Sequence, residues 1–269
     1  MSTALSAAAR FRELHGPGQL LVLPNVWDAM SARLVEAAGG TALATSSAVV
    51  AWAHGMKDGE RLPLDRLFTA TQDILRVVRI PVSVDFERGY GTDAASVADA
   101  VWQLAKIGVA GVNLEDGGEP PEVLASKLVA CREALRRHGR DLFLNARTDI
   151  LLHRTLQGDA ALDEIVRRAK RYADAGCDGV FVPGLSNAEG LARVVSEVPV
   201  PLNVWAAPTL PPPEQLRALG VRRVSVGPRL ALTALLAAKR DAEQLLAGRW
   251  APTLEGPPLT YPEVNGWFT

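Results

Sequence analysis

Four segments of this chain repeat one pattern, and that pattern restricts the possible folds more than any other feature. Each segment starts as an alanine-rich stretch of helical character, passes through a glycine and ends in a short apolar run of strand length. The four segments are VEAAGGTALATSS (35–47), AKIGVAGVNLEDG (105–117), ADAGCDGVFVPG (173–184) and RALGVRRVSVGP (217–228). Their glycines, Gly39, Gly108, Gly176 and Gly220, stand where a helix ends through positive φ. A repeated helix and strand predicts parallel strands joined by crossover helices.

Four further apolar runs, at 20–23, 80–86, 141–147 and 200–205, raise the expected number of strands to about eight. Eight parallel strands interleaved with helices predict an α/β fold, a (β/α)₈ barrel, and 269 residues suffice for one. The alternative is an open doubly wound sheet. That fold usually carries a glycine-rich phosphate loop after its first strand, and LLVLPNVWD has none. We expect the barrel over residues 1–247, followed by a C-terminal arm, 248–269, rich in proline and aromatic residues.

Composition narrows the class of function. The chain is 48% hydrophobic and 22% charged, which is typical of globular proteins. Its 29 basic and 30 acidic residues nearly cancel, so no overall field attracts nucleic acid or an anionic membrane. No apolar run reaches the roughly 18 residues of a membrane span, and the first residues lack the features of a secretory signal. We expect a cytoplasmic enzyme with a small-molecule partner, bound neither to nucleic acid nor to a membrane.

Side-chain alternation along the predicted strands sends polar groups toward one axis. In PVSVDFE, GVNLE and LFLNAR, apolar residues alternate with polar or charged ones, and the apolar set should face the helices. The inward residues gather at the C-terminal ends of their strands, the end at which barrel enzymes hold their active sites. They are Asp85, Glu87, Asn113, Glu115, Arg147, Asn203 and Trp205.

Three of these residues are carboxylates, Asp85, Glu87 and Glu115, which repel one another unless they are protonated or neutralised by a cation. Oxygen ligands without histidine or cysteine favour Mg²⁺, with Mn²⁺ as a substitute, over Zn²⁺. We expect Asp85 to bind the metal directly and the two glutamates to bind largely through water. The alternative is that the acids pair with Arg88 and Arg147.

Arg147 keeps its charge at any working pH, so it is suited to hold a carboxylate or a developing oxyanion. The alternative role is a salt bridge to Glu115 or Asp149, and the two roles are compatible. Ser46 and Ser47, at the end of another predicted strand, either hold a substrate carboxylate or simply cap that strand.

From about Leu20 to Leu236 the chain resembles the isocitrate lyase and phosphoenolpyruvate mutase superfamily. The motifs that carry the resemblance are PNVWDAMSARLVEAAG, TSSAVVAWAHGMKDGE, VDFERGYG, VNLEDG, NARTD, PLNVW and RVSVGP, in the family's order and spacing. The resemblance implies a (β/α)₈ barrel with Mg²⁺ at its mouth and a 2-oxo acid, or its enol form, as ligand.

The resemblance also implies roles for individual residues. Asp85, Glu87 and Glu115 would form the metal shell, with Glu87 in place of the family's usual aspartate. Arg147 and Asp58 would be the catalytic residues, and Asp58 would close over the site from its loop. The substrate would be held by Thr45, Ser46, Ser47, Ala48, Asp85, Arg147 and Asn203.

The chain departs from the family's lyases in one loop. Those lyases carry a Lys-Lys/Arg-Cys-Gly-His gating loop after the glutamate that corresponds to Glu115, and its cysteine is the acid or base for carbon–carbon cleavage. Here DGGEPPEVLASKL follows, with neither cysteine nor histidine. Cys131 lies in the next predicted helix, where a buried structural thiol is expected.

These features together predict a Mg²⁺-dependent lyase or decarboxylase that acts on an oxaloacetate-like 2-oxo acid through a metal-stabilised enolate. Decarboxylation demands least of a gating loop, because departing CO₂ needs no general base. The alternatives are a phosphonopyruvate-type C–P bond hydrolase or mutase and a non-catalytic 2-oxo acid binding protein.

A Schiff-base aldolase needs an inward lysine, and every lysine falls on a predicted loop or helix. Gly227 and Pro228 suggest a phosphate site or an ordinary helix start.

The resemblance further implies a homo-oligomer, a dimer of dimers in which a C-terminal helix crosses to the neighbouring barrel. The apolar stretch 230–248 suits that exchange. Four aromatic residues of the arm should pack against something: Trp250, Tyr261, Trp267 and Phe268. The alternative is that helix and arm wrap their own barrel.

Overall fold

The computed structural model describes residues 5–154, 156–251 and 259–268. Nine parallel strands form one sheet in the order β1-β9-β8-β7-β6-β5-β4-β3-β2. Their bounds are Leu21–Leu23 (β1), Asn25–Val26 (β2), Leu43–Thr45 (β3), Val82–Asp85 (β4), Gly111–Glu115 (β5), Phe143–Arg147 (β6), Gly179–Val182 (β7), Leu202–Trp205 (β8) and Arg223–Ser225 (β9).

The two ends of this order are consecutive in the chain, so the sheet curls into a nearly closed barrel. β1 pairs with β9 and β2 pairs with β3, with only Pro24 between β1 and β2. Proline has no N–H to give to a ladder, and here it divides one barrel strand into two short pieces. The predicted (β/α)₈ barrel is therefore confirmed, with its first strand split at Pro24.

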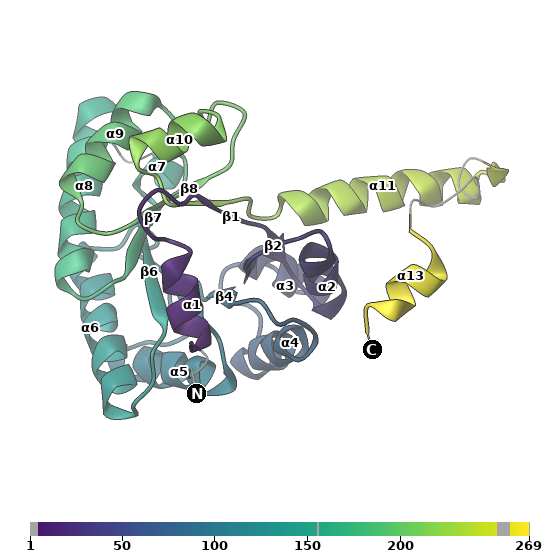
Figure 1. Ribbon diagram of the computed structural model, residues 1–269, viewed down its shortest axis with the longest axis horizontal. Coiled ribbons are helices and arrows are strands. Elements are labelled where there is room, and N and C mark those ends of the chain that lie inside the picture. The colour runs from purple at the N-terminus through teal and green to yellow at the C-terminus, as the bar shows by residue number, and fades with distance from the viewer. Residues whose placement is uncertain (1–4, 155, 252–258, 269) are drawn as a thin grey trace.

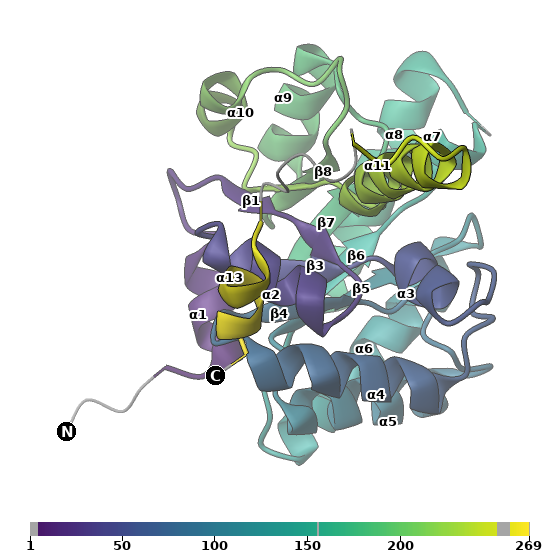
Figure 2. The same ribbon diagram turned by 90° about the vertical axis from the view of Figure 1, so that its right-hand side faces the viewer.

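Helices surround the strands (Figures 1 and 2). Their bounds are Ala7–Glu13 (α1), Ala29–Ala37 (α2), Ser47–Ala53 (α3), Leu64–Val77 (α4), Ala94–Ile107 (α5), Pro121–Arg137 (α6), Ile150–His153 (α7), Gly158–Asp174 (α8), Ala188–Glu197 (α9), Pro213–Leu219 (α10), Arg229–Leu246 (α11) and Tyr261–Gly266 (α13). Gly108 and Gly220 end α5 and α10 in the left-handed conformation, as the repeat predicts. Among the described residues, no helix combines the length and apolar character that crossing a membrane requires.

Apolar side chains pack on both sides of the sheet. Outward side chains such as Val84, Val112 and Leu144 pack against the helices in the larger core. A smaller core inside the barrel holds Phe11 of α1 against Phe143. Gly111 makes room for it, because a Cβ there would lie 2.9 Å from the Phe11 ring. Helix α1 thus fills the barrel from the end at which the strands begin.

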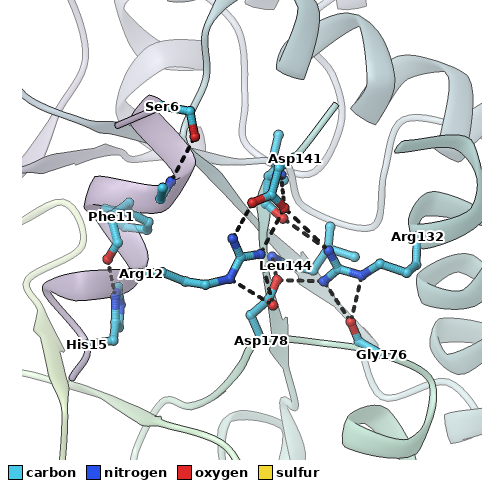
Figure 3. Close-up of polar contacts among 11 residues, drawn as sticks. Ser6, Phe11, Arg12, His15, Arg132, Asp141, Leu144, Gly176 and Asp178 are labelled. Atoms are coloured by element: carbon cyan, nitrogen blue, oxygen red, sulfur yellow. Dashed lines mark hydrogen bonds and ion pairs between the residues drawn. The ribbon is translucent and has the colours of Figure 1, made fainter. Parts of the chain in front are cut away.

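A network of ion pairs holds that end together (Figure 3). Asp178 lies at the start of β7, where its carboxylate accepts hydrogen bonds from Arg132 of α6 at 2.6 Å and from Arg12 of α1 at 3.0 Å. Arg12 also pairs with Asp141, just before β6. The network links α1 to the strand starts and leaves the C-terminal strand ends to the polar groups described below.

The C-terminal segment leaves the barrel. Helix α11 projects away from it, and of its residues Ala231 alone is described as buried (Figure 1). The arm includes a short helix, α13, which the composition of the arm did not indicate. It ends beside α2, where Arg33 donates to the Trp267 carbonyl at 2.8 Å. Trp250, Tyr261 and Phe268 remain exposed in the single chain, and residues 252–258 of the arm lie outside the described ranges.

We expect His15 to make stability fall in acid. Burial, together with the charge of Arg223, lowers the pKa of His15 to about 3, while an unfolded histidine titrates near 6.5. The unfolded state therefore binds more protons between these values, and the folded state loses stability as the pH falls. Urea unfolding should show about 1.4 kcal/mol more loss per pH unit from pH 6 to 4 in wild type than in His15→Gln. Exposed His138→Gln should keep the wild-type slope; equal slopes in all three proteins would disprove the assignment.

Candidate active site

A pocket of about 290 Å³ opens at the C-terminal ends of the strands, where the sequence predicts the site. It contains six predicted site residues: Ser46, Ser47, Ala48, Asp58, Asp85 and Arg147. The rest of its lining is Asn25, Trp52, Asn113, Leu152, Phe181, Pro183, Trp205, Ser225, Gly227 and Pro228. Thr45, Glu87, Glu115 and Asn203 are not part of this lining.

The pocket has two chemically different sides. Most charged and hydroxyl groups, including Ser47, Asp85 and Arg147, come from the ends of β3 to β6, which are neighbours in the barrel, and Ser225 adds a hydroxyl from β9. Phe181 and Trp205, on the next two strands, form an apolar wall that is extended by Pro183. The pocket thus offers a ligand a polar side along the first group of strands and an apolar side along the second.

Asp85 is the last residue of β4 and is held from one side only. Its Oδ2 accepts hydrogen bonds from the Ser47 hydroxyl at 2.9 Å and the Ser47 N–H at 3.2 Å. Its N–H donates to Thr45 Oγ1, which places buried Thr45 behind the site as a support. Asp85 Oδ1 is buried and has no hydrogen-bond partner in the described chain. An unpartnered carboxylate oxygen is costly to bury, so this atom is suited to a cation.

Glu115 and Arg147 face each other as the last residues of β5 and β6, where they are register partners. Arg147 Nη1 lies 2.9 Å from Glu115 Oε2, and Arg147 Nε donates to Asp149 Oδ1 at 2.6 Å. Burial raises the pKa of Glu115, and Arg147 opposes that rise. Burial alone would lower the pKa of Arg147, but the charges of Glu115, Asp149 and Asp85 together raise it. The salt bridges considered as an alternative role for Arg147 are present, and Arg147 also lines the pocket.

Glu87 holds two loops together beside the pocket. Its carboxylate accepts hydrogen bonds of 2.6 Å from the Glu60 N–H and from the Tyr90 hydroxyl, and Glu60 in turn accepts from the Tyr90 N–H. Burial raises the pKa of Glu87, against these hydrogen bonds. All three residues have positive φ, which is unusual for non-glycine residues and concentrates backbone strain here. The loop that carries Asp58 is thereby fastened to the end of β4.

Several expectations about neighbouring residues need correction or refinement. Arg88 pairs with Glu60 and Glu119, not with the three predicted acids. Asn203 points into the barrel but is buried, and it bonds to Ser225. No group of three His, Cys, Asp or Glu side chains within the described ranges is gathered closely enough to enclose a metal. Each oxygen of Glu87 nevertheless keeps a second lone pair for water.

Asn25, which the sequence analysis missed, closes the barrel at the pocket. Its Oδ1 accepts from the N–H groups of Val226 and Gly227, both at 2.9 Å, and its Nδ2 donates to the Thr45 carbonyl. These two amides are the ones that a phosphate site near Gly227 and Pro228 would use, so the ordinary helix start is the better interpretation. The inward position of Asn25 after LLVL could have indicated its role.

The segment after Glu115 is a short turn held by a buried ion pair. Asp116 Oδ2 accepts hydrogen bonds of 2.8 Å from Arg168 and Tyr172 of α8, and Oδ1 accepts from the Asp149 N–H at 3.1 Å. Arg168 also donates to the Glu119 carbonyl at 2.7 Å. The Asp116 side chain has no exposed surface. At the position of the family's gating loop, residues 116–120 therefore form a short turn that hydrogen bonds connect to α8.

Loss of Arg168 should be strongly destabilising, because Asp116 would remain as a buried, uncompensated charge. We expect Arg168→Met to lower the free energy of unfolding by about 3–5 kcal/mol in urea titrations. Arg171→Met, on the same helix but in an exposed pair with Glu122, should cost less than about 1 kcal/mol. Similar losses in the two variants would show that the turn does not depend on this ion pair.

Comparison with known proteins places this geometry in a family. The family model described as phosphoenolpyruvate phosphomutase matches residues 11–246. An uncharacterized protein of Mycobacterium tuberculosis is 36% identical over 90% of this chain and 91% of its own length. Oxaloacetate decarboxylase of Pseudomonas entomophila is 30% identical over 88% of this chain and 84% of its own length.

A solved structure gives the same result. The crystal structure of a putative phosphonomutase from Burkholderia cenocepacia is 39% identical, with a TM-score of 0.84, and the match covers 88% of this chain and 99% of that one. The resemblance seen in the motifs is thus confirmed over nearly the whole barrel. The chain belongs to the phosphoenolpyruvate phosphomutase family, within the enzyme superfamily that includes the isocitrate lyases.

Proposed function

We propose that this protein is a Mg²⁺-dependent decarboxylase of a small, oxaloacetate-like 2-oxo acid, or a lyase that cleaves the corresponding carbon–carbon bond. The observation that carries the proposal is the division of the pocket into a polar side, with Asp85 and Arg147, and an apolar wall, with Phe181 and Trp205. The similarity to an oxaloacetate decarboxylase supports it.

The residues present fit a magnesium ion. Buried, unpartnered Asp85 Oδ1 would hold it directly, and Glu87 and Glu115 would hold it through water. When bound, Mg²⁺ supplies Lewis-acid polarisation of the 2-oxo acid. This fit rests on carboxylate oxygens, the ligands that magnesium prefers.

The chain's own residues perform the remaining tasks. The Ser46 hydroxyl binds the C1 carboxylate, since the Ser47 hydroxyl and N–H already donate to Asp85. The Arg147 guanidinium stabilises the negative charge that develops on the C2 oxygen. The bond between C3 and the departing carboxylate breaks, its electron pair forms the enolate, and CO₂ leaves. C3 then takes a proton from solvent, and Asp58 covers the substrate from its loop.

The apolar wall favours this reaction over the alternatives. A C3 carboxylate beside Phe181, Pro183 and Trp205 loses hydration, and it becomes neutral as CO₂ departs. A phosphonate group would keep its charge in the same place. Arg147 is the cationic residue in the described lining, and two carboxylates already pair with it. Phosphonopyruvate-type chemistry is therefore the second candidate, supported by the similarity to a putative phosphonomutase.

The first test is turnover of oxaloacetate, followed by NMR detection of pyruvate, with phosphonopyruvate in parallel. Activity should require Mg²⁺ or Mn²⁺ and vanish with EDTA. Asp85→Ala should lower kcat/KM by about a thousandfold or more while the fold is retained, because the direct metal ligand is lost.

Cys131→Ser is the matched control for this test. Cys131 is buried on α6, and burial raises the pKa of its thiol to about 12, so it cannot replace the cysteine of a gating loop. The variant should keep full activity. Metal-independent turnover or an active Asp85→Ala would refute the proposal, and tight binding of 2-oxo acids without any turnover would instead indicate a binding protein.

We also propose a homo-oligomer built through α11. In the single chain this helix exposes Leu232, Leu235 and Leu236, and the Leu236 side chain is 69% exposed. Their spacing of three to four residues places these leucines on one face of the helix, and such an apolar face is usually buried. Exposed Trp250 and Tyr261 in the arm add to this surface. A second copy of the chain is the partner that the family resemblance implies.

Light scattering at micromolar concentration tests the assembly. Truncation after Gly248 should weaken it, and Leu236→Glu should weaken it further, because a charge would be buried in an apolar interface. Asp241→Lys, on the opposite face of the same helix from Leu232, is the control and should leave the oligomer intact. A monomeric full-length protein would contradict the proposal.

A further inference from the structure

Arg223 is a buried cation inside the barrel that the proposed mechanism does not use. It is the first residue of β9, it is completely buried, and it is the largest such side chain described. Its Nη2 donates to Asn113 Oδ1 at 3.2 Å, while Nε and Nη1 have no hydrogen-bond partner. A buried guanidinium without a carboxylate partner is expensive, and such a feature calls for a reason.

The surroundings below Arg223 are neutral. The Phe11 ring lies 5.7 Å from the guanidinium carbon, and His15 stacks on Phe143 nearby. Arg223 is one cause of the low pKa of His15, which keeps that imidazole uncharged at neutral pH. Burial lowers the pKa of Arg223 itself to about 9, so the guanidinium remains charged at neutral pH. Figure 3 shows Phe11 on α1 and His15 just beyond the end of this helix.

The active site lies directly above. Arg223 precedes Ser225 by two residues on the same face of β9, and Ser225 lines the pocket. Asn113, which accepts its hydrogen bond, also lines the pocket and is the register partner of Asp85. The charge of Asp85 favours the protonated form of Arg223. One neutral side chain therefore separates a fixed positive charge from the proposed metal ligand.

We propose that Arg223 is a positioning residue whose positive charge, beneath the pocket, changes the electrostatic potential of the site. Its field weakens divalent cation binding at Asp85 and strengthens binding of the anionic ligand. The inference rests on the proposed function, in which Asp85 binds the metal. A guanidinium paired with a carboxylate would have little field outside the pair, whereas this one keeps its field because it is bonded to a neutral amide. The acidic groups alone would favour the cation and repel a 2-oxo acid or its enolate.

The two parts of the inference have opposite signs, and this makes it testable. Loss of the charge should tighten metal binding and weaken anion binding together. Collapse of the barrel interior would instead weaken both, because it would displace Asn113 and Asp85 alike.

The experiment measures Mn²⁺ binding by the full-length protein with electron paramagnetic resonance, and then calorimetric binding of oxalate, a stable dianion resembling the enolate, to the Mg²⁺-loaded protein. Arg223→Gln should bind Mn²⁺ about three- to tenfold more tightly and oxalate about tenfold more weakly. Arg223→Lys, which keeps the charge, should stay within about twofold of wild type in both. Arg132→Met removes an arginine from the opposite end of the barrel and should change neither affinity.

A second variant covers the case in which Arg223→Gln does not fold. Asn203 is the register partner of Arg223 on β8 and is buried away from the pocket, so Asn203→Asp places a compensating negative charge beside the guanidinium. It should shift both affinities in the same directions as Arg223→Gln. Parallel losses of both affinities, or no change in either, would overturn the role of Arg223. Wild-type Mn²⁺ binding that survives in Asp85→Ala would overturn the proposed site itself, a separate outcome.

Discussion

The ion pair between Glu115 and Arg147 is the interaction on which the site depends. Two adjacent parallel strands end in opposite charges 2.9 Å apart, at a depth where neither group is fully hydrated. Because Arg147 also binds Asp149, its guanidinium is oriented before any ligand arrives. Asp149 is in turn held through its N–H by Asp116, whose carboxylate is anchored to α8. The electrostatic side of the pocket is thus built outward from one pair of strand ends.

Charged side chains occur at both ends of the barrel, but they are paired differently at the two ends. At the strand starts, Asp178 is shared by Arg12 and Arg132, and acids and bases satisfy one another. At the strand ends, one oxygen of Asp85 remains without a donor, and in the barrel interior beneath it Arg223 and His15 also have side-chain nitrogens without partners. Full pairing stabilises a structure, whereas incomplete pairing at a pocket leaves capacity for a ligand. The unpartnered oxygen of Asp85 therefore supports the candidate site at the strand ends independently of any relative.

Alternation along the strands predicted which face each residue occupies, but not its depth or the path of the chain beyond the strand. Asp85, Glu115 and Arg147 were predicted correctly as inward, since each ends a regular strand. Asn203 is inward too, but one layer too deep to line the pocket. Glu87 lies past the end of β4, where positive φ breaks the alternation. The same alternation could have predicted that Phe181 faces the pocket. Trp52 and Leu152 reach the pocket from helices, so strand periodicity cannot predict them.

The anchored turn after Glu115 connects the fold to the choice of reaction. A mobile loop carrying an acid or base can deliver a proton to a leaving group, but residues 116–120 contain neither cysteine nor histidine and are tied down by Arg168. The leaving group must then depart without a proton from that loop. CO₂ satisfies this condition, because its departure leaves both electrons of the broken bond on the substrate and transfers no proton. The apolar wall and the anchored turn therefore both support the proposed decarboxylation, the wall because it lowers hydration of the departing group and the turn because it carries no cysteine or histidine.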